Sequence, residues 1–212
     1  VGRRFFSIFV CFNTKPMNRL IRSSILAGIT IGIAGFGYLA VGGLAGAVLF
    51  AFGLLTVVGY KLKLYTGTAG FVNKGEFVDL LVILLGNIVG CLLVGLLTRA
   101  SNLELQAAAQ KILEVRLQNG ALRCGLLGIG CGFIMTTAVT FSREKNYLPL
   151  LFGVPLFIIC GFTHCVADAF YYLSVPIDFL KVHFLEIIGV YVSIVLGNFI
   201  GCNLVRIFGL KE

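Results

Sequence analysis

Long apolar segments dominate this sequence and decide what kind of fold it can adopt. Several of them approach or exceed the ~20 residues with which an α-helix crosses a bilayer. Hydrophobic residues make up 58% of the chain and charged residues only 12%, whereas soluble domains carry about 25% charged residues. The sequence therefore predicts an all-α polytopic membrane protein with a single transmembrane domain in residues 1–212.

We expect six membrane-spanning segments in this domain. The predicted spans are residues 20–41, 42–66, 77–97, 122–141, 148–173 and 182–207, with a polar amphipathic connection between the third and the fourth. Six spans place both termini on the same side of the membrane. That side carries ten of the Lys and Arg residues outside the spans, and the other side carries five. Because basic loops stay in the cytoplasm, we predict that both termini are cytoplasmic.

The N-terminal stretch before the first span has a composition of its own. The segment VGRRFFSIFVCFNTKP has the charges and the short apolar core of a signal peptide, but no small-x-small cleavage site follows it. We favour a natural start at Met17, with the sixteen residues before it as an upstream extension. We therefore expect residues 1–18 to lie outside the transmembrane domain.

The net charge of +8 and the seven cysteines argue against several classes of partner. Lys and Arg gather at the ends of the spans, which favours roles in orientation and in contact with anionic membrane lipid. No basic patch is interleaved with aromatic residues, so we expect no nucleic-acid partner. The cysteines form no CxxC pair and no His/Cys cluster with metal-ligand spacing, so we expect neither a metal nor a cofactor.

An internal repeat connects the third and the sixth span. LGNIVGCLLV starts at Leu85 and LGNFIGCNLV starts at Leu196, with three spans between the two copies. An odd number of spans per half makes the two halves insert in opposite directions, which is an inverted 3+3 repeat. The repeat predicts that spans two and five are broken at matched places, where KLKLYTGTAG and CGFTHCVAD interrupt apolar runs. Irregular backbone at this depth must be buried in protein or line a wet cavity, which predicts a central path.

The break in the fifth span contains an ionisable ring, His164. A histidine inside a membrane span is a functional candidate by default, because its desolvation must be tolerated for a reason. We therefore favour a pore-lining role for His164 over a structural one. Asp168 follows one helical turn later, and we favour a role in capping the second half-helix over contact with the transported species.

The break in the second span offers polar candidates of its own. Thr66 has a hydroxyl that can both donate and accept, so it can orient an imidazole or touch a substrate. Lys61 and Lys63 lie close to the middle of the span. They either reach a wet vestibule and attract anions, or the helix ends earlier than predicted, at about Tyr60.

Asn87 and Asn198 are the matched polar residues of the repeat. Two interpretations of this pair remain open: hydrogen bonds that join helices, which are common for Asn in membrane bundles, or a position in the pore wall. The neighbouring glycines have GxxxG spacing in both copies, and we interpret them as sites of close helix packing.

Four segments together resemble the formate/nitrite transporter family. They are FAFGLLTVVGYKLKLYTG, LGNIVGC, CGFTHCVADAFYY and LGNFIGC, and the LYTG form is most similar to the hydrosulfide-channel branch. The resemblance runs from about Arg19 to Arg206. It implies a homopentamer of aquaporin-like protomers, each with its own pore for small monovalent anions of weak acids, such as formate, nitrite, hydrosulfide, acetate or lactate.

The resemblance also implies roles for individual residues. By position, His164 is the central pore histidine and Thr66 is its partner. Apolar narrowing of the pore falls on Phe50, Leu54, Leu64, Tyr65 and Phe157, a polar position near the pore falls on Asn198, and the vestibule lysine falls on Lys111 or Arg116. This sequence departs from the family at three positions: Thr163 stands where a Glu usually precedes the histidine, Asp168 stands where an Asn is frequent, and Gly132 replaces a polar Asn in the fourth span.

These observations predict a transport protein and not an enzyme. We expect small weak-acid anions (formate, nitrite or hydrosulfide) to cross through the central pore, coupled to protonation of the anion, in the plasma (inner) membrane of a prokaryote. The alternative is a haem- or quinone-linked membrane subunit of an oxidoreductase. Haem binding of that kind needs paired axial histidines inside the spans, and only His164 lies deep in one, since His183 stands at a span boundary.

Overall fold

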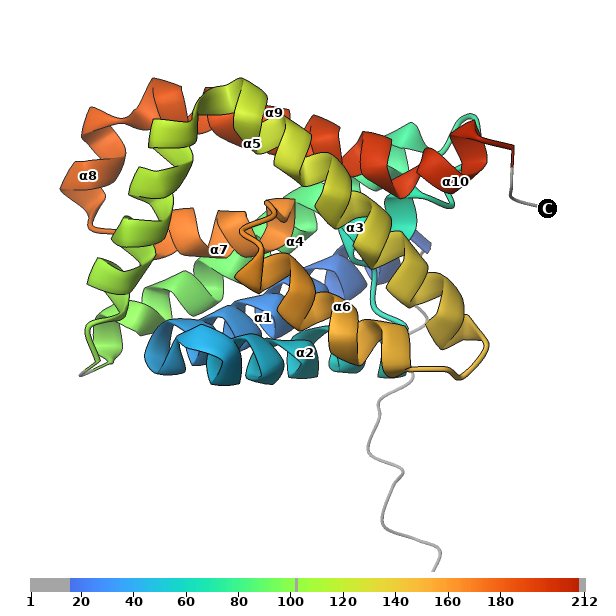
Figure 1. The fold of residues 1–212 in the computed structure, drawn as a ribbon, viewed down its shortest axis with the longest axis horizontal. Helices are drawn as coiled ribbons and strands as arrows, with labels where there is room; N and C mark the ends of the chain where they lie inside the picture. The colour runs from blue at the N-terminus through green and yellow to red at the C-terminus, as the bar shows by residue number, and fades with distance from the viewer. Residues whose placement is uncertain (1–15, 102, 210–212) are drawn as a thin grey trace, which may run out of the picture.

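The computed structural model describes residues 16–101 and 103–209, and every regular element in these ranges is a helix (Figure 1). Four helices are long and apolar enough to cross a membrane: α1 (Pro16–Val41), α4 (Phe77–Ala100), α5 (Leu105–Arg143) and α9 (Phe184–Cys202). The protein is therefore a multi-pass membrane protein. The predicted extension, residues 1–18, lies outside the described residues except for its last three, which begin α1.

The two remaining predicted spans are each divided between two helices. The second span consists of α2 (Gly43–Gly59) and the short α3 (Tyr65–Ala69). The fifth span consists of α6 (Leu148–Ile159) and α7 (Cys165–Ser174). Both predicted breaks are thus confirmed, and each one is a non-helical segment of five residues.

Both breaks begin with the same turn. At the end of α2, Lys61 adopts a left-handed conformation with φ 54°, and at the end of α6 Gly161 does so with φ 71°. In each case the N–H of the left-handed residue and the N–H of the next residue donate back to carbonyls in the last helical turn. This is the usual way to satisfy the last carbonyls of a helix. The two breaks therefore share a backbone turn even though their side chains differ.

The predicted polar connection and the predicted fourth span form one helical element, α5. Buried Leu105, Ala109 and Leu113 recur at the four-residue spacing of one helix face, which explains why this polar stretch is helical. The helix turns at Gly120, whose φ of 71° and ψ of 171° are not helical. At the C-terminal end, the predicted sixth span is shorter than expected, because α9 is preceded by α8 (Ile177–Val182) and followed by α10 (Leu204–Ile207).

Close packing of two helix pairs builds the frame of the molecule. α4 lies along α1, and α9 lies along α5 (Figure 1). A Cβ at Gly90 would collide with the carbonyl oxygen of Ile25 in α1, and a Cβ at Gly201 would collide with that of Ile129 in α5. The glycines with GxxxG spacing therefore allow backbone contact in both pairs, as small residues do in membrane helices.

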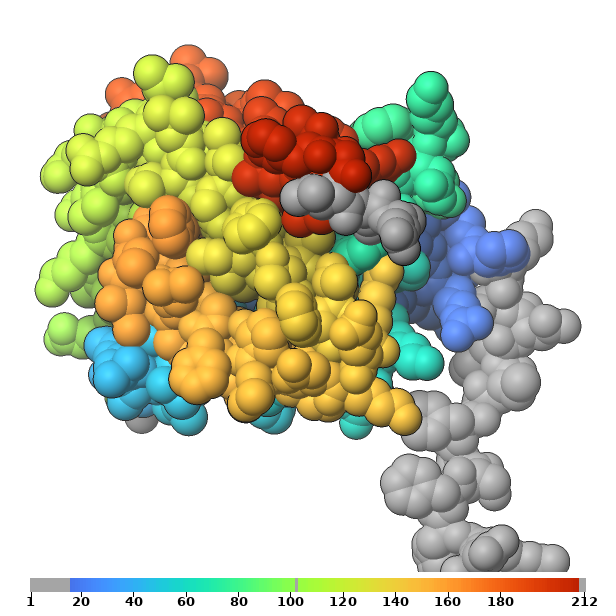
Figure 2. Space-filling view, turned by 45° about the vertical axis from the view of Figure 1, so that its right-hand side comes forward, coloured from blue at the N-terminus to red at the C-terminus, as the bar shows by residue number. Residues whose placement is uncertain are grey.

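The outer surface of the frame is apolar. Large exposed side chains include Leu81 on α4, Phe152 on α6 and Leu196 on α9. Figure 2 shows one side of the molecule, where α5 and α6 form a continuous face. An apolar surface of this extent is a liability in water and is suited to contact with lipid or with other membrane helices.

Candidate functional site

His164 stands at the end of the second break, as the N-cap residue of α7. Its side chain is buried with only 2% exposed. The imidazole Nδ1 accepts hydrogen bonds from the backbone N–H groups of Val166 (3.2 Å) and Ala167 (3.1 Å). These N–H groups belong to the first turn of α7, where they lack helical partners. The start of α7 therefore fixes the orientation of the ring.

The same geometry fixes the tautomer of the ring. Because Nδ1 accepts two hydrogen bonds, it carries no hydrogen, and the neutral imidazole has its hydrogen on Nε2. Nε2 lies 3.0 Å from Oγ1 of Thr66, so His164 donates and the Thr66 hydroxyl accepts. The hydrogen of that hydroxyl is then left for another acceptor. This bond joins the two breaks, because Thr66 lies in α3 and His164 caps α7.

Apolar side chains surround this polar centre. The ring of Phe157 stacks on His164 with 5.5 Å between the ring centroids, and Phe50 meets Phe157 edge-on at 5.9 Å. Leu54 and Leu64 are buried in the same hydrophobic core. Tyr65 is also buried, and its hydroxyl donates to the carbonyl oxygen of Val195 in α9 at 3.4 Å. The residues predicted to narrow a pore are therefore buried here, and Phe157 and Phe50 form a continuous row of ring contacts from His164.

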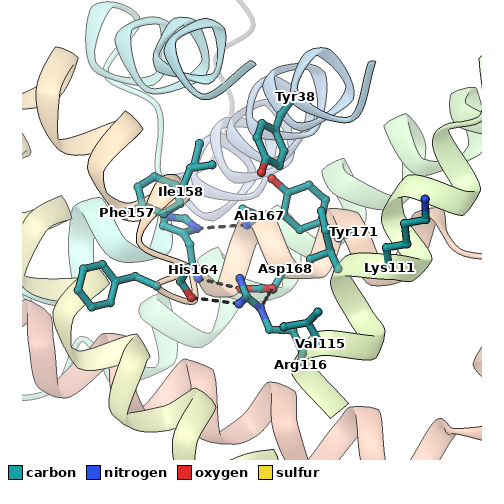
Figure 3. Close-up of a pocket in the computed structure, with 13 residues that line it drawn as sticks. Tyr38, Lys111, Val115, Arg116, Phe157, Ile158, His164, Ala167, Asp168 and Tyr171 are labelled. Atoms are coloured by element: carbon teal, nitrogen blue, oxygen red, sulfur yellow. Dashed lines mark hydrogen bonds and ion pairs between the residues drawn. The ribbon is translucent and has the colours of Figure 1, made fainter. Parts of the chain in front are cut away.

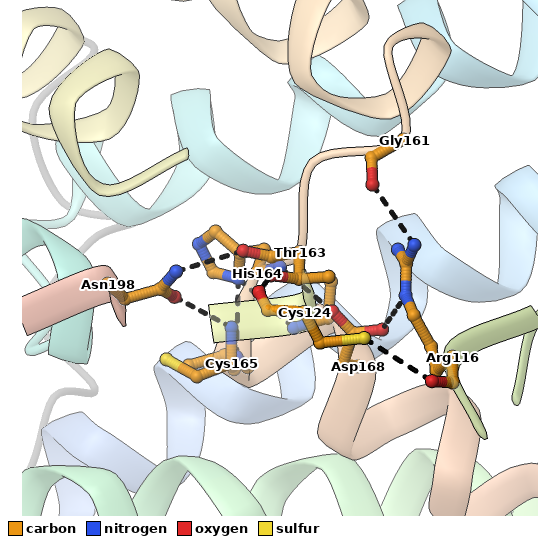
Figure 4. A network of polar contacts seen from close by, with 10 residues as sticks. Arg116, Cys124, Gly161, Thr163, His164, Cys165, Asp168 and Asn198 are labelled. Atoms are coloured by element: carbon orange, nitrogen blue, oxygen red, sulfur yellow. Dashed lines mark hydrogen bonds and ion pairs between the residues drawn. The ribbon is translucent and has the colours of Figure 1, made fainter. Parts of the chain in front are cut away.

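An ion pair lies on the other side of the break (Figure 4). Asp168 is fully buried. Its Oδ2 accepts a hydrogen bond from the backbone N–H of His164 at 2.8 Å, and its Oδ1 accepts one from Nε–H of Arg116 at 3.0 Å. Nη1 of Arg116 donates to the carbonyl oxygen of Gly161 at 3.0 Å. Asp168 therefore makes the contact that a capping role requires, and Arg116 balances its charge.

Asn87 holds the first break against the helix frame. Its Oδ1 accepts the backbone N–H of Tyr65 at 2.9 Å. Its Nδ2 donates to the carbonyl oxygens of Ser24 (2.8 Å) and Lys63 (2.9 Å). The amide is fully buried, and both its oxygen and its nitrogen are engaged with backbone. Of the two interpretations left open above, this geometry favours the one in which Asn87 joins helices.

Asn198 makes the equivalent bonds at the second break. Its Oδ1 accepts the N–H of Cys165 at 2.8 Å, and its Nδ2 donates to the carbonyl oxygens of Gly128 and Thr163, both at 2.9 Å. The side chain of Thr163 points elsewhere, because its hydroxyl donates to the carbonyl oxygen of Cys124 in α5 at 2.7 Å. The two asparagines thus make matched contacts, as an internal repeat predicts.

Two cavities approach the polar centre. The first, of about 310 Å³, reaches His164 and is also lined by Tyr38, Lys111, Arg116 and Tyr171 (Figure 3). Neither tyrosine was predicted from the sequence. Tyr38 comes near the end of a predicted span, where tyrosine usually marks the membrane interface. Its sequence position therefore gives no signal that it lines a cavity.

The second cavity, of about 910 Å³, is lined by Lys61, Lys63 and Gly67, the neighbour of Thr66. Both lysines are exposed. Since α2 ends at Gly59, they lie beyond the helix end, so the earlier of the two predicted end points is correct. Their position in the wall of a cavity is also the one expected of vestibule residues.

The two cavities lie at opposite ends of α1. Leu20 lines the second cavity and Tyr38 lines the first. At 1.5 Å per residue, they are about 27 Å apart along the helix axis, which is close to the ~30 Å of a bilayer's hydrocarbon core. The His164–Thr66 bond lies between the cavities, because His164 lines the first and the residue after Thr66 lines the second.

This fold and site define a class: a polytopic helical membrane protein in which two broken spans meet between two cavities. The family model described as "Formate/nitrite transporter" matches residues 12–209. The chain therefore belongs to the formate/nitrite transporter family. This membership places it among transport proteins, and not among the oxidoreductase subunits considered as the alternative.

Solved structures share the fold. A pentameric formate channel with formate bound is 24% identical, with a TM-score of 0.73 over 92% of this chain and 98% of that chain. An FNT family ion channel is 19% identical, with a TM-score of 0.77 over 93% of this chain and 92% of that chain. A comparison with curated proteins found no match.

Proposed function

We propose that the protein conducts small monovalent anions of weak acids, such as formate, nitrite or hydrosulfide, between the two cavities. The observation that carries this proposal is the hydrogen bond between His164 and Thr66. It places two polar side chains, one from each broken span, between cavities at opposite ends of α1. The Thr66 hydroxyl hydrogen, which the neutral His164 leaves free, is the donor that an arriving anion meets.

Crossing the apolar stack requires that the anion lose its charge. A bare anion between side chains such as Phe50 and Phe157 would be strongly disfavoured, because an unpaired charge in an apolar medium costs many kcal/mol. Protonation of the anion removes most of this cost. A neutral His164 that gave up its Nε2 hydrogen would become an imidazolate, so we infer that the proton comes from water in the cavity, and the hydroxide that this leaves returns to the solution on the side of entry. The net movement is then one anion with one proton.

The charged walls of the cavities collect the anion before this step. Lys61 and Lys63 line the larger cavity together with the basic residues Arg143 and Lys145, and these four outnumber the acidic residues of its wall, Glu76 and Asp79. Lys111 and Arg116 line the smaller one. Clefts lined by an excess of one charge raise the local concentration of the opposite ion. We therefore assign the four predicted basic residues to the vestibules of the path: Lys61, Lys63, Lys111 and Arg116.

The proposed assembly is a homopentamer in the plasma (inner) membrane of a prokaryote, with both termini in the cytoplasm. The apolar outer surface supports contact with lipid and with neighbouring subunits, and one of the structures with this fold is pentameric. Because the polar centre is built from one chain, each protomer would contain its own path.

The first test separates the donor role of His164 from its capping role. We expect His164→Asn to keep α7 capped, because asparagine is a favoured N-cap residue, while it removes the bond to Thr66. Thr66→Val removes the hydroxyl at nearly constant shape. In liposome flux assays with formate and hydrosulfide, both variants should lose at least about tenfold in flux or change their selectivity, as expected when a hydrogen-bonding group in a selective site is removed.

The matched control is Thr140→Val, because Thr140 is exposed and its hydroxyl bonds only to its own helix at the carbonyl oxygen of Thr136 among the described contacts. Its flux should equal that of the unaltered protein. Wild-type flux and selectivity in both His164→Asn and Thr66→Val would contradict the proposed centre.

A further inference from the structure

Two basic residues line the cavity in front of His164, and the structure distinguishes what they do. Arg116 and Lys111 are both on α5 and both contribute to the wall of the 310 Å³ cavity. Their sequence positions leave open which of them attracts the anion. Figure 3 shows that their surroundings differ: Arg116 lies against Asp168, whereas Lys111 extends along the wall without a drawn partner.

The charge of Arg116 is compensated. Its Nε lies 3.0 Å from Oδ1 of Asp168, and the two side chains are 11% and 0% exposed. Opposite unit charges at this separation attract each other strongly when water is largely excluded, and at larger distances their fields nearly cancel. An anion that enters the cavity therefore meets a short dipole at this point, and not a full positive charge.

The same pair fastens the break that carries His164. Arg116 bonds to the carbonyl oxygen of Gly161, which starts the break with its left-handed turn, and Asp168 bonds to the backbone N–H of His164, which ends it. The pair thus spans the loop from its first turn to the imidazole-bearing residue (Figure 4). A shift of Arg116 or Asp168 would move the ring that donates to Thr66.

The charge of Lys111 is not compensated in the described part of the chain. Lys111 is exposed, and none of the ion pairs within residues 16–101 and 103–209 includes it. The only acidic residue in the wall of this cavity is Asp168, which is already paired with Arg116. Lys111 is therefore the source of the positive field in the cavity.

We propose a division of labour in this cavity: Lys111 concentrates the anion, and Arg116 with Asp168 is an electroneutral positioning pair that holds His164 in place. This inference rests on the proposed function, since it concerns the supply of anions to the same centre. It makes Arg116 a positioning residue, although its charge alone would suggest an anion attractor.

The test separates apparent affinity from maximal flux in liposomes, over a range of formate concentrations. Lys111→Gln should raise the apparent KM about threefold to tenfold and leave the maximal flux intact, as expected for the loss of electrostatic concentration. This effect should shrink in high concentrations of an inert salt, because screening shortens the reach of the charge to about 3 Å at 1 M.

Arg116→Gln should lower the maximal flux about tenfold or more with little change in KM or in salt dependence, because small displacements of a positioned group have large effects. It also leaves the buried carboxylate of Asp168 without a partner. The double variant Arg116→Gln/Asp168→Asn should recover flux relative to Arg116→Gln, since it removes the uncompensated charge. Arg116→Lys keeps the charge pair, so its maximal flux should stay close to that of the unaltered protein. If Arg116→Gln does not fold, Arg116→Lys and the double variant together provide the test.

The proposal is overturned if Arg116→Gln raises KM in a salt-dependent way while Lys111→Gln has no effect. If Arg116→Gln does not fold, the same result with Arg116→Lys overturns it. The proposal is also overturned if the double variant Arg116→Gln/Asp168→Asn has as little flux as Arg116→Gln. If Arg116→Gln does not fold, an inactive double variant has the same meaning. Failure of the proposed function looks different, because the unaltered protein would then show no more formate flux than empty liposomes.

Discussion

Single side chains at the polar centre hold irregular backbone in place as well as contacting one another. His164 caps α7 with Nδ1 and donates to Thr66 with Nε2. Asn87 and Asn198 use both ends of their amides to tie the breaks to the frame. Because buried polar groups are costly when they lack partners, these bonds are what allows irregular backbone to persist at membrane depth.

At this scale we predict that Asn198→Ala strongly destabilises the protein. The substitution leaves the N–H of Cys165 and the carbonyl oxygens of Gly128 and Thr163 without their side-chain partner. The carbonyl of Gly128 keeps its partner inside α5, so two buried groups are left unsatisfied at about 1–3 kcal/mol each, and the loss should be at least about 2 kcal/mol. Thermal unfolding of the purified protein in detergent measures it.

The control for this prediction is Asn18→Ala, at an exposed position in the first turn of α1. Its effect should stay within about 0.5 kcal/mol, as for most surface substitutions. Equal unfolding midpoints for the two alanine variants would show that the amide of Asn198 does not hold the break.

The elements that matter most are the two breaks, which share a backbone and differ in sequence. Gly161 is suited to its left-handed turn, because it has no Cβ, whereas Lys61 adopts the same conformation at a cost of about 1–2 kcal/mol. Both residues are followed by matched hydrogen bonds back to the preceding helix. A lysine at a position that favours glycine is consistent with a role for its charge in the larger cavity.

At the element scale we predict opposite outcomes for two substitutions. Gly161→Ala should lower stability by about 1–2 kcal/mol, and the cause is backbone strain alone, since an added Cβ would meet no atom within 4 Å. Lys61→Gly should leave stability unchanged or slightly raised, because relief of strain offsets the greater freedom of glycine in the unfolded chain.

Thermal unfolding again provides the measurement. A loss of stability in Lys61→Gly as large as that in Gly161→Ala would mean that the lysine side chain, and not the turn, stabilises the first break.

Much of the architecture can be predicted from the sequence, because hydropathy and the repeat report on it directly. The breaks at Lys61 and Gly161 are visible as polar interruptions, and the pairing of His164 with Thr66 is implied by the resemblance to the family. The helical course of residues 105–119 is harder to predict, because this stretch is polar enough to resemble a loop. The bond between Arg116 and Asp168 has no local signal, since it joins residues 52 positions apart.

The whole molecule has a cavity toward each end of α1, and buried apolar side chains pack around His164. Leu20 and Tyr38, the α1 residues that line the two cavities, are about 27 Å apart along the helix axis, and the ring of Phe157 stacks on His164. A charged species would have to cross this region without compensation. A neutral acid crosses it with far less loss of solvation.

At the scale of the molecule we therefore predict electroneutral transport. Moving one net charge across a membrane is worth about 2.3 kcal/mol per 100 mV, so the distribution of a bare anion would follow the voltage. In liposomes, a membrane potential set with potassium and valinomycin should not change formate distribution, and a pH gradient should. Distribution that follows the voltage and ignores the pH gradient would contradict coupling to a proton.

Leu64 and His164 occupy the same place in the two halves. Each is the N-cap of a short helix in extended conformation, and each is followed by a residue whose N–H donates to the matched asparagine. Both halves keep the asparagine, whereas the N-cap residue is an apolar leucine in one half and an ionisable histidine in the other. The ionisable group of the polar centre thus comes from one half only, and residue 64 is the position at which the other half could acquire one.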